Sequence, residues 1–394
     1  MNNKKRNFLI LSPSEWGDSA VSNMQIAAEL SKKHNVIYVE TPGRRMPKLN
    51  ELSRAIKKLV KIFSNKTQFK INGLDKVNVK IFSPFAIPSS KFFIIRKINK
   101  LLLVLQINKY LEKVDTNNLT ILCYSPLWLD IIKILKYSNL IFHCVDGLHT
   151  YNKDVYFADQ YDAIAKKSDI VITPGVLLYE ELKKINTNTY KISHGVTEEL
   201  LSIIDKKEKI IPSEILKIKN DIVIYSGTLA NWVDFKIIEY IAKELEDITF
   251  LIIGYVHALT AKKDINKITA LKNVILTGFK NYHELPHYYK HCKVAIVPYQ
   301  INEHIIYSSP TKFFDYFSAG LPVVTTNFPS AETFGDLVYI ANDKESFLSS
   351  LKKAIKEDDI RLVQRRKDIT RNSTWAVQVT KMIALIEDFE KNKS

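Results

Sequence analysis

One stretch of the chain, SSPTKFFDYFSAGLPVVTT at residues 308–326, constrains the fold more than any other. Ser309 is a favourable N-cap, and Pro310 suits the first helical position, where its missing N–H costs nothing. Gly320 predicts the end of that helix, and Pro322 prevents the helix from resuming. The stretch therefore predicts a short, well-delimited helix that leads directly into the apolar run that follows it.

The side chains of this helix divide into two groups. Phe313, Phe314 and Phe317 fall on one face, which predicts that this face packs inward. Lys312 and Asp315 lie three residues apart on the other face. Taken alone, this pattern is typical of an amphipathic core helix with two solvated charges.

Apolar runs alternate with helical patterns along most of the chain, which predicts an α/β protein built on parallel strands. Such a chain of 394 residues exceeds one ordinary core and indicates two domains. The runs predict strands at residues 7–11, 36–40, 119–124, 140–145, 169–173, 188–193, 222–226, 249–253, 273–277, 294–299 and 323–325. The expected parts are a first domain over 1–201, a linker over 202–220, a second domain over 221–372 and a closing amphipathic helix over 373–394.

The segment SPTKFFDYFSAGLPVV resembles the donor-site signature of GT-B glycosyltransferases, S-P-x-K-x-x-[E/D/Q]-Y-x-x-x-G-x-P-V-V. It is most similar to bacterial polysaccharide enzymes of the teichuronic-acid and xanthan glucuronosyltransferase kind. Residues 225–232, YSGTLANW, resemble the first loop of the family's donor domain, and 194–196, HGV, resemble the turn that closes its first domain. The resemblance implies two Rossmann-like domains facing a cleft, with the closing helix crossing back onto the first domain. It also implies a transferase of cell-envelope polysaccharide biosynthesis.

The resemblance further implies that the second domain binds a nucleotide diphosphate sugar, with UDP as the expected nucleotide and no separate cofactor. Lys312 is expected to meet the diphosphate and Asp315 the ribose. Gly227 would let the backbone approach the diphosphate, because it has no Cβ. The other residues expected to bind the donor are Thr228, Glu303, Ser309 and Thr311.

A catalytic base is expected at the end of the predicted strand 140–145, where Asp146 enters a loop at the cleft-facing edge. The aspartate proposed as base in the xanthan glucuronosyltransferases has a similar position. Asp146 is equally well read as a loop-capping aspartate, and Glu15 and Asp18 are rivals for the role. His143 lies inside the strand and is interpreted as a core histidine.

Two absences bear on the chemistry that the resemblance implies. No DxD motif occurs, so no metal site is expected, and Lys312 together with helix N-termini must stabilise the leaving nucleotide. Retaining relatives carry a glutamate eight residues before the ribose carboxylate, where this chain has Tyr307. This difference favours transfer with inversion.

Positive charge is concentrated in the first quarter of the chain. Residues 1–110 contain 21 Lys and Arg against 6 Asp and Glu, a difference of +15, which equals the net charge of the whole chain. An apolar helical stripe at 48–63 is surrounded by basic residues, and 91–110 is a second basic, apolar segment. These segments are either two ordinary helices with solvated lysines or a face that lies on an anionic membrane. The residues expected at this acceptor or membrane face are Trp16, Arg54, Lys57, Lys58 and Lys61.

The leading hypothesis is therefore a metal-independent glycosyltransferase that uses a lipid-linked glycan acceptor at the inner face of the cell membrane. Three scattered cysteines and the absence of a secretory or membrane-spanning signal favour a cytoplasmic, peripheral location. A nucleotide-sugar 2-epimerase-like enzyme is an alternative, but it would not need the basic first quarter. A basic nucleic-acid- or membrane-binding protein without catalysis is a second alternative, although the donor signature gives no reason to expect nucleic acid.

Overall fold

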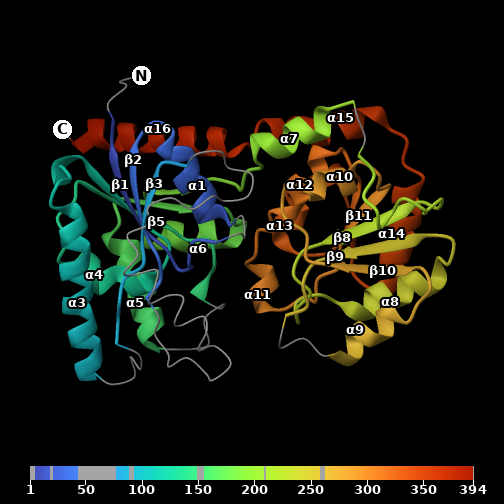
Figure 1. Cartoon of the computed structure of the whole chain (residues 1–394), viewed down its shortest axis with the longest axis horizontal. Helices are drawn as coiled ribbons and strands as arrows, with labels where there is room; N and C mark the ends of the chain where they lie inside the picture. The colour runs from blue at the N-terminus through green and yellow to red at the C-terminus, as the bar shows by residue number, and fades with distance from the viewer. Residues whose placement is uncertain are drawn as a thin grey trace. The chain divides into compact units, whose positions relative to one another are not determined.

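The computed structural model describes residues 5–17, 21–42, 77–87, 93–148, 155–207, 210–257 and 262–393. The chain divides into two compact units, each built around its own sheet (Figure 1). Unit 1 comprises residues up to 174, 178–192 and those from 379 onward, and unit 2 comprises 175–177 and 193–378.

Unit 1 has, within the described residues, a seven-stranded sheet in which every pairing is parallel. The strand order is β3-β2-β1-β4-β5-β6-β7. Its central strands are buried along their whole length, because helices cover both faces of a parallel sheet. The strands are β1 (Asn7–Leu11), β2 (Asn35–Val39), β3 (Val79–Phe82), β4 (Leu119–Cys123), β5 (Asn139–His143), β6 (Ile170–Thr173) and β7 (Thr189–Lys191).

The helices of unit 1 connect these strands, and the last part of the final helix also belongs to this unit. Arg6, which directly precedes β1, joins this strand to the final helix. The Arg6 guanidinium donates two hydrogen bonds of 2.7 and 2.8 Å to the Glu390 carboxylate. Asn139 donates a third, of 2.7 Å, to the same carboxylate. The helices are α1 (Ser22–Ser31), α3 (Phe93–Leu111), η2 (Thr116–Asn118), η3 (Pro126–Trp128), α4 (Leu129–Ile132), α5 (Val155–Lys167), α6 (Val176–Ile185) and α16 (Trp375–Lys393).

Unit 2 has, among the residues described, a six-stranded parallel sheet of order β10-β9-β8-β11-β12-β13. The strands are β8 (Ile222–Ser226), β9 (Thr249–Ile253), β10 (Val274–Gly278), β11 (Val294–Val297), β12 (Val323–Thr326) and β13 (Val338–Ala341). The helices are α7 (Glu198–Asp205), α8 (Phe235–Glu244), α9 (Lys262–Thr269), α10 (Leu285–Tyr289), α11 (Glu303–Ile306), α12 (Lys312–Ser318), α13 (Pro329–Glu332), η5 (Gly335–Leu337), α14 (Lys344–Ile355) and α15 (Ile360–Arg371).

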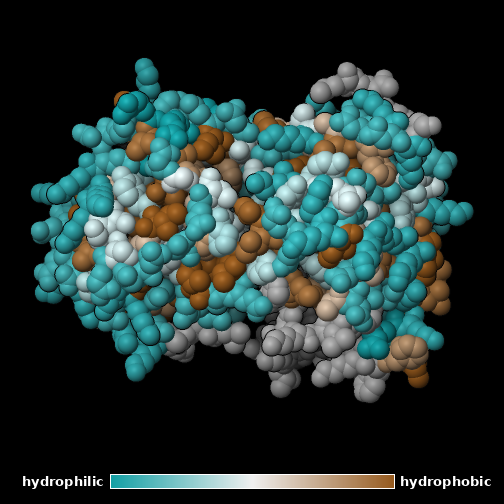
Figure 2. All heavy atoms as spheres, turned by 180° about the vertical axis from the view of Figure 1, so that it is seen from behind, coloured by the Kyte–Doolittle hydropathy of each residue, from teal (hydrophilic) through white to brown (hydrophobic). Residues whose placement is uncertain are grey.

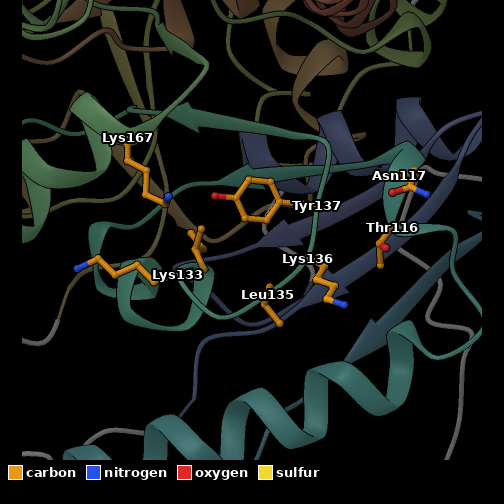
Figure 3. A pocket seen from close by; sticks show the side chains of 8 residues that line it. Thr116, Asn117, Lys133, Leu135, Lys136, Tyr137 and Lys167 are labelled. Carbon is orange, nitrogen blue, oxygen red and sulfur yellow. The ribbon is translucent and has the colours of Figure 1, made fainter.

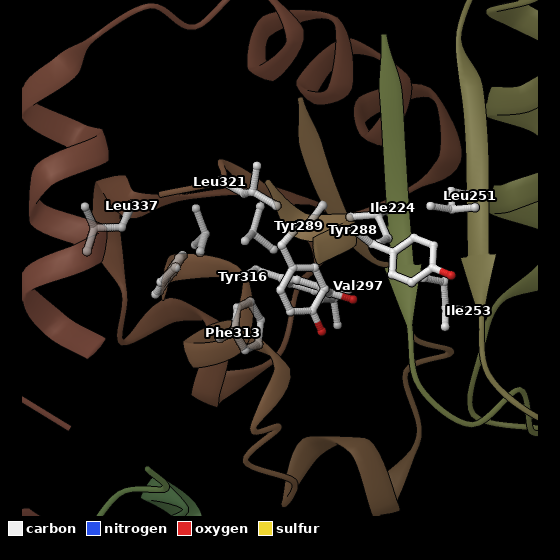
Figure 4. Close-up of a cluster of buried hydrophobic side chains, with 14 of the residues drawn as sticks. Ile224, Leu251, Ile253, Tyr288, Tyr289, Val297, Phe313, Tyr316, Leu321 and Leu337 are labelled. Carbon is white, nitrogen blue, oxygen red and sulfur yellow. The ribbon is translucent and has the colours of Figure 1, made fainter. Parts of the chain in front are cut away.

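Alternate strand residues of unit 2 point to opposite faces of the sheet and build two separate cores. On one face Ile224 and Val297 pack with Phe313 and Tyr316 of α12 (Figure 4). On the other face Val223 and its strand neighbours pack with α8 and α14. The first of these cores fixes α12 against the sheet, which determines where the polar side chains of α12 lie.

The α/β class and the two-sheet architecture are confirmed, and most predicted strands match within two residues. Two strands, β3 and β13, were not predicted. The predicted linker over 202–220 differs from the structure, because Ile204 and Ile215 are buried in the core of unit 2. The long segment of unit 2 accordingly begins at Ser193. The predicted helix over 48–63 lies outside the described residues.

The central helix begins later than predicted. Its N-cap is Thr311 and its first residue is Lys312, so the prediction of Ser309 as N-cap was wrong. The predicted end is confirmed: Gly320 has a φ of 76°, and the Leu321 N–H donates to the Tyr316 carbonyl, as in a Schellman motif. Moving the helix start by two residues places Lys312 at its first position.

Candidate active site

Two glycine-containing loops meet at the carboxyl edge of the unit 2 sheet. Gly227 follows β8 and Gly254 follows β9, with φ values of 144° and 151°. A Cβ on Gly254 would lie 1.9 Å from the Gly227 carbonyl oxygen. A Cβ on Gly227 would lie 2.8 Å from Nζ of Lys312. Both positions therefore require glycine. Because Gly227 has no side chain, the Lys312 ammonium can lie close to the Gly227 backbone.

Lys312 is enclosed by aromatic rings. Its Nζ donates a 3.2 Å hydrogen bond to the Tyr225 hydroxyl and lies 4.3 Å from the centre of that ring. The Tyr299 ring lies 5.0 Å away. Burial lowers the pKa of Lys312 to about 7, and the Asp315 charge opposes this shift in part. No carboxylate among the described residues forms an ion pair with this ammonium, so its remaining N–H groups can meet an anion.

Asp315 lies one helical turn further on and is buried. The Tyr282 hydroxyl, which follows β10, donates a 2.6 Å hydrogen bond to Oδ1. Burial raises the pKa of Asp315 to about 6, whereas the Tyr282 hydrogen bond and the Lys312 charge both lower it. Near neutral pH, Asp315 is thus an ionised carboxylate that burial destabilises. It can accept hydrogen bonds from hydroxyl groups.

Two further tyrosines contact the last residue of β8, Ser226, and one of them, Tyr316, belongs to α12. The backbone N–H of Ser226 donates a 2.8 Å hydrogen bond to the Tyr316 hydroxyl. The Ser226 and Tyr289 hydroxyls are 2.9 Å apart. The Tyr289 and Tyr316 rings meet edge to face at 5.5 Å and lie side by side in Figure 4. Four buried tyrosines and the partly buried Tyr282 therefore form a scaffold around both charged residues; the buried ones are Tyr225, Tyr289, Tyr299 and Tyr316.

The other residues predicted to bind a donor lie in unit 2. Thr228 is partly exposed, and its carbonyl accepts a 3.0 Å hydrogen bond from Tyr225. Thr311 is exposed at the start of α12, and Glu303 is exposed at the start of α11. The Ser309 backbone hydrogen-bonds the ring of His194, a buried histidine whose pKa burial lowers to about 4.

The predicted base lies in unit 1. Asp146 is exposed in the loop after β5, and its carbonyl accepts a 3.3 Å hydrogen bond from the Cys144 thiol. Glu15 is partly buried, and Asp18 lies outside the described residues. His143 is buried and its ring stacks on Tyr124 at 4.8 Å, as expected for a core histidine.

Trp16 does not form the exposed face predicted for it. The side chain is only 6% exposed, and its ring meets Tyr38 edge to face at 4.8 Å. Its backbone N–H donates a 2.7 Å hydrogen bond to the buried Glu40 carboxylate. These contacts make Trp16 a core residue of unit 1, so a contact of this ring with a membrane is ruled out for this structure. The basic residues Arg54, Lys57, Lys58 and Lys61 lie outside the described residues.

Sequence reasoning missed several residues that shape the site. Gly254 and Tyr282 follow strands that were predicted, but no motif marked them. Tyr299 ends the predicted strand 294–299, and no motif marked it as a site residue. The position of each residue just after a strand of a parallel sheet was the available signal, because these ends converge at one edge.

A separate hollow of about 390 Å³ lies in unit 1. It lies at the edge of the unit 1 sheet where the strands begin, and it is formed by residues that precede β4, β5 and β6 (Figure 3). Lys133, Lys136 and Lys167 are among its lining residues. Within the described part of the chain, no group of three or more His, Cys, Asp or Glu could hold a metal ion. No helix there is long and apolar enough to cross a membrane.

Comparison with known proteins agrees with this geometry. Residues 221–357, which include the whole Lys312 site, match the family of glycosyl transferases group 1. The Bacillus subtilis protein TuaH, named as a teichuronic acid biosynthesis glycosyltransferase, is 28% identical over 54% of this chain and 55% of its own length. A UDP-glucuronate:glycolipid 2-beta-glucuronosyltransferase of Xanthomonas campestris is 23% identical over 58% of this chain and 53% of its own length. The chain thus spans about half the length of the curated relatives it matches.

Solved structures share the fold over nearly the whole chain. Anabaena HepE, solved with UDP and glucose, is 14% identical and has a TM-score of 0.65, covering 98% of this chain and 100% of its own. Sucrose-phosphate synthase of Thermosynechococcus elongatus is 13% identical and has a TM-score of 0.72 over the same shares. The chain therefore has the two-sheet fold of GT-B glycosyltransferases and carries, at residues 221–357, a glycosyl transferases group 1 domain.

Proposed function

We propose that this protein transfers a sugar from a nucleotide diphosphate donor, with UDP as the nucleotide, to a lipid-linked or polysaccharide acceptor. The observation that carries the proposal is the contact of the Lys312 ammonium with Gly227, with Asp315 one helical turn away. The named activities of the two curated relatives and the UDP bound to HepE support the choice of donor and of acceptor class.

Lys312 would bind the diphosphate of the donor. Glycosyl transfer leaves a nucleotide that gains negative charge, and a positioned cation stabilises that charge most in a site of low polarity. Binding a diphosphate would raise the lowered pKa of Lys312 and keep the ammonium protonated. Gly227 would allow its backbone to approach the same phosphates, since no Cβ intervenes. This charge comes from the chain itself, and the proposed reaction needs no metal ion.

Asp315 would accept hydrogen bonds from the ribose hydroxyls. Its buried carboxylate already accepts one hydrogen bond, from Tyr282, which leaves the second oxygen as the acceptor for the donor. Thr228, Glu303, Ser309 and Thr311 would complete the donor site.

Asp146 would act as the base that takes the proton from the acceptor hydroxyl. A direct attack of this hydroxyl on the donor sugar inverts the anomeric centre. Tyr307 stands where retaining relatives have a glutamate, which supports inversion. The acceptor would be met at the inner face of the cell membrane, with the protein peripheral and cytoplasmic.

The test combines binding and product analysis. Purified protein is titrated with UDP in a calorimeter and then incubated with a panel of UDP-sugars and a lipid extract, and products are identified by mass spectrometry. We expect UDP to bind and one sugar to appear on a lipid, with an inverted anomeric proton coupling in the NMR spectrum. Failure of every nucleoside diphosphate to bind would overturn the donor assignment, and a retained configuration would overturn inversion and the role of Asp146.

A further inference from the structure

Helix α3 exposes a line of large apolar side chains on the side opposite its packed face. Its buried residues include Leu103, Val104 and Ile107. The exposed residues follow one another at intervals of four, three and four, which places them on one stripe of an α-helix. They are Ile94, Ile98, Leu101 and Leu105, with exposures of 70%, 43%, 61% and 58%. A helix that only covered a sheet would be expected to carry polar residues there, so the stripe needs an explanation.

The stripe is open to the outside of unit 1. Figure 1 shows α3 at the margin of this unit, beside α4, with no other described element on its outer side. In Figure 2, which shows the reverse view, brown side chains lie along the margin where α3 runs, among teal ones. Phe93 is also exposed, at the first turn of the same helix.

Positive charge accompanies the stripe. Lys97 and Lys109 flank it on its two sides at the helical spacing of 100° per residue, whereas Arg96 and Lys100 fall toward the packed side of the helix. The Lys97 ammonium lies 4.5 Å from the centre of the Phe93 ring. No Asp or Glu occurs anywhere from residue 76 to residue 111. Helix α3 is thus apolar along this stripe, basic at the two borders of the stripe and without acidic residues of its own.

We propose that α3 lies in the surface of an anionic membrane, with its apolar stripe among the acyl chains and its basic side chains at the lipid phosphates. Amphipathic helices with this division of residues bind lipid interfaces, and each basic residue near an anionic surface strengthens binding by roughly 5-fold. A second copy of the chain fits less well, because it would bring two acid-free basic borders together. This inference rests on the peripheral location proposed above, whereas the donor site lies in unit 2, so a failure here would overturn the membrane contact of α3 and leave the donor assignment and the transfer reaction to their own tests.

Vesicle binding tests the surface directly. The full chain is mixed with vesicles of phosphatidylcholine and phosphatidylglycerol, or of phosphatidylcholine alone, and bound protein is measured by flotation without donor or acceptor. The variant I94Q/I98Q/L101Q/L105Q should bind the anionic vesicles at least about 100-fold more weakly than wild type, since four apolar side chains no longer enter the lipid. The variant K97Q/K109Q, which removes the two flanking charges, should bind about 25-fold more weakly than wild type at low salt and nearly as well as wild type at high salt.

A matched control has equally exposed apolar residues in unit 2. These are Ile210, Leu216, Phe279 and Ile360, with exposures of 57%, 62%, 57% and 74%. Their joint replacement by Gln should leave vesicle binding unchanged within about twofold. Equal loss in the control variant would show that general surface apolarity, and not α3, binds the lipid, which overturns the proposal.

A label on the stripe keeps the test independent of the multiple variants. An environment-sensitive fluorophore on Leu101→Cys should shift its emission to shorter wavelength with anionic vesicles, while the same label on Phe279→Cys should not. The natural Cys123 and Cys144 are buried and Cys292 is partly buried, so labelling favours the new cysteine. An unshifted label on Leu101→Cys would overturn insertion. Concentration-dependent dimers that the I94Q/I98Q/L101Q/L105Q variant abolishes, without vesicle binding by wild type, would instead assign the stripe to self-association.

Discussion

Lys312 lies in surroundings that disfavour its charged form. Its ammonium faces two tyrosine rings and a glycine backbone, and burial brings its pKa to about 7. Removing the ammonium from water costs stability, because desolvation penalises the charged form. The arrangement is intelligible if an anionic ligand completes the site.

Replacing Lys312 by Ala should leave the fold intact and lower the transfer rate by about 10²–10³-fold, as expected for the loss of one charged donor to a developing anion. UDP affinity measured by calorimetry should also fall. Lys344→Ala is the matched control, since Lys344 also lies over a tyrosine ring, at 4.8 Å from the Tyr240 centre, but on the surface. A Lys312→Ala protein with wild-type turnover would return this residue to a structural role.

The raised pKa of Asp315 predicts that replacing this carboxylate by a neutral side chain increases stability in a pH-dependent way. Its pKa is raised from 3.8 to about 6, so its ionised form destabilises the folded state. This destabilisation is complete above about pH 6 and absent below about pH 4. Asp315→Asn should therefore raise the free energy of unfolding by about 3 kcal/mol at pH 8, and the gain should vanish as pH falls from 6 to 4. Denaturant unfolding at several pH values measures this, and transfer should be lost in the same variant.

The opposite sign is expected at Asp343, which caps α14 and has a lowered pKa because it accepts hydrogen bonds from Ser346. Asp343→Asn should therefore give no gain in stability at pH 8. A gain at Asp343 equal to that at Asp315 would show that the effect of Asp315→Asn comes from surface charge and not from burial.

At the scale of elements, local sequence determined how α12 ends but not how it begins. Gly320 and Pro322 act through their own backbone, so the end could be predicted. Ser309 has the right chemistry for an N-cap, but its backbone hydrogen-bonds His194, far away in the sequence. The burial of Lys312 and Asp315 was equally hidden, because the tyrosines that surround them come from other elements.

Strand prediction succeeded where apolar runs are fully buried and failed where they are short or mixed. The central strands β1, β8 and β9 were predicted with their observed bounds. The edge strands β3 and β13 contain partly exposed positions, so their patterns are weaker. Trp16 was misplaced for the converse reason, since a large side chain in a loop gives no periodicity from which burial could be inferred.

The contact between the loops after β8 and β9 gives a prediction at this scale. Gly254→Ala would place a Cβ 1.9 Å from the Gly227 oxygen at a φ of 151°, so one loop must move. We expect a loss of several kcal/mol in stability and of UDP binding, measured by thermal unfolding and calorimetry. Gly278→Ala is the control, because its φ is 76° but nothing lies within 4 Å of the added Cβ. It should cost only about 1 kcal/mol, and equal losses in both variants would contradict the steric account.

For the whole molecule we expect transfer to survive an excess of EDTA. The proposed chemistry draws its positive charge from Lys312, and the described residues offer no group of metal-ligand side chains. Transfer is assayed before and after chelation, beside a metal-dependent glycosyltransferase as control. Activity that disappears with EDTA and returns with Mg²⁺ or Mn²⁺ would mean that a metal shares the phosphate role.

Unit 1 is completed by residues that lie after all of unit 2 in the chain. Glu390 of α16 receives hydrogen bonds from Arg6 and Asn139, although some 250 residues or more separate it from either. During synthesis, which runs from the N-terminus, the first sheet must wait for this helix while the ribosome makes unit 2. Unit 2 can therefore finish folding first, and the newly made unit 1 spends that interval without its last helix, when it is most open to proteases and chaperones.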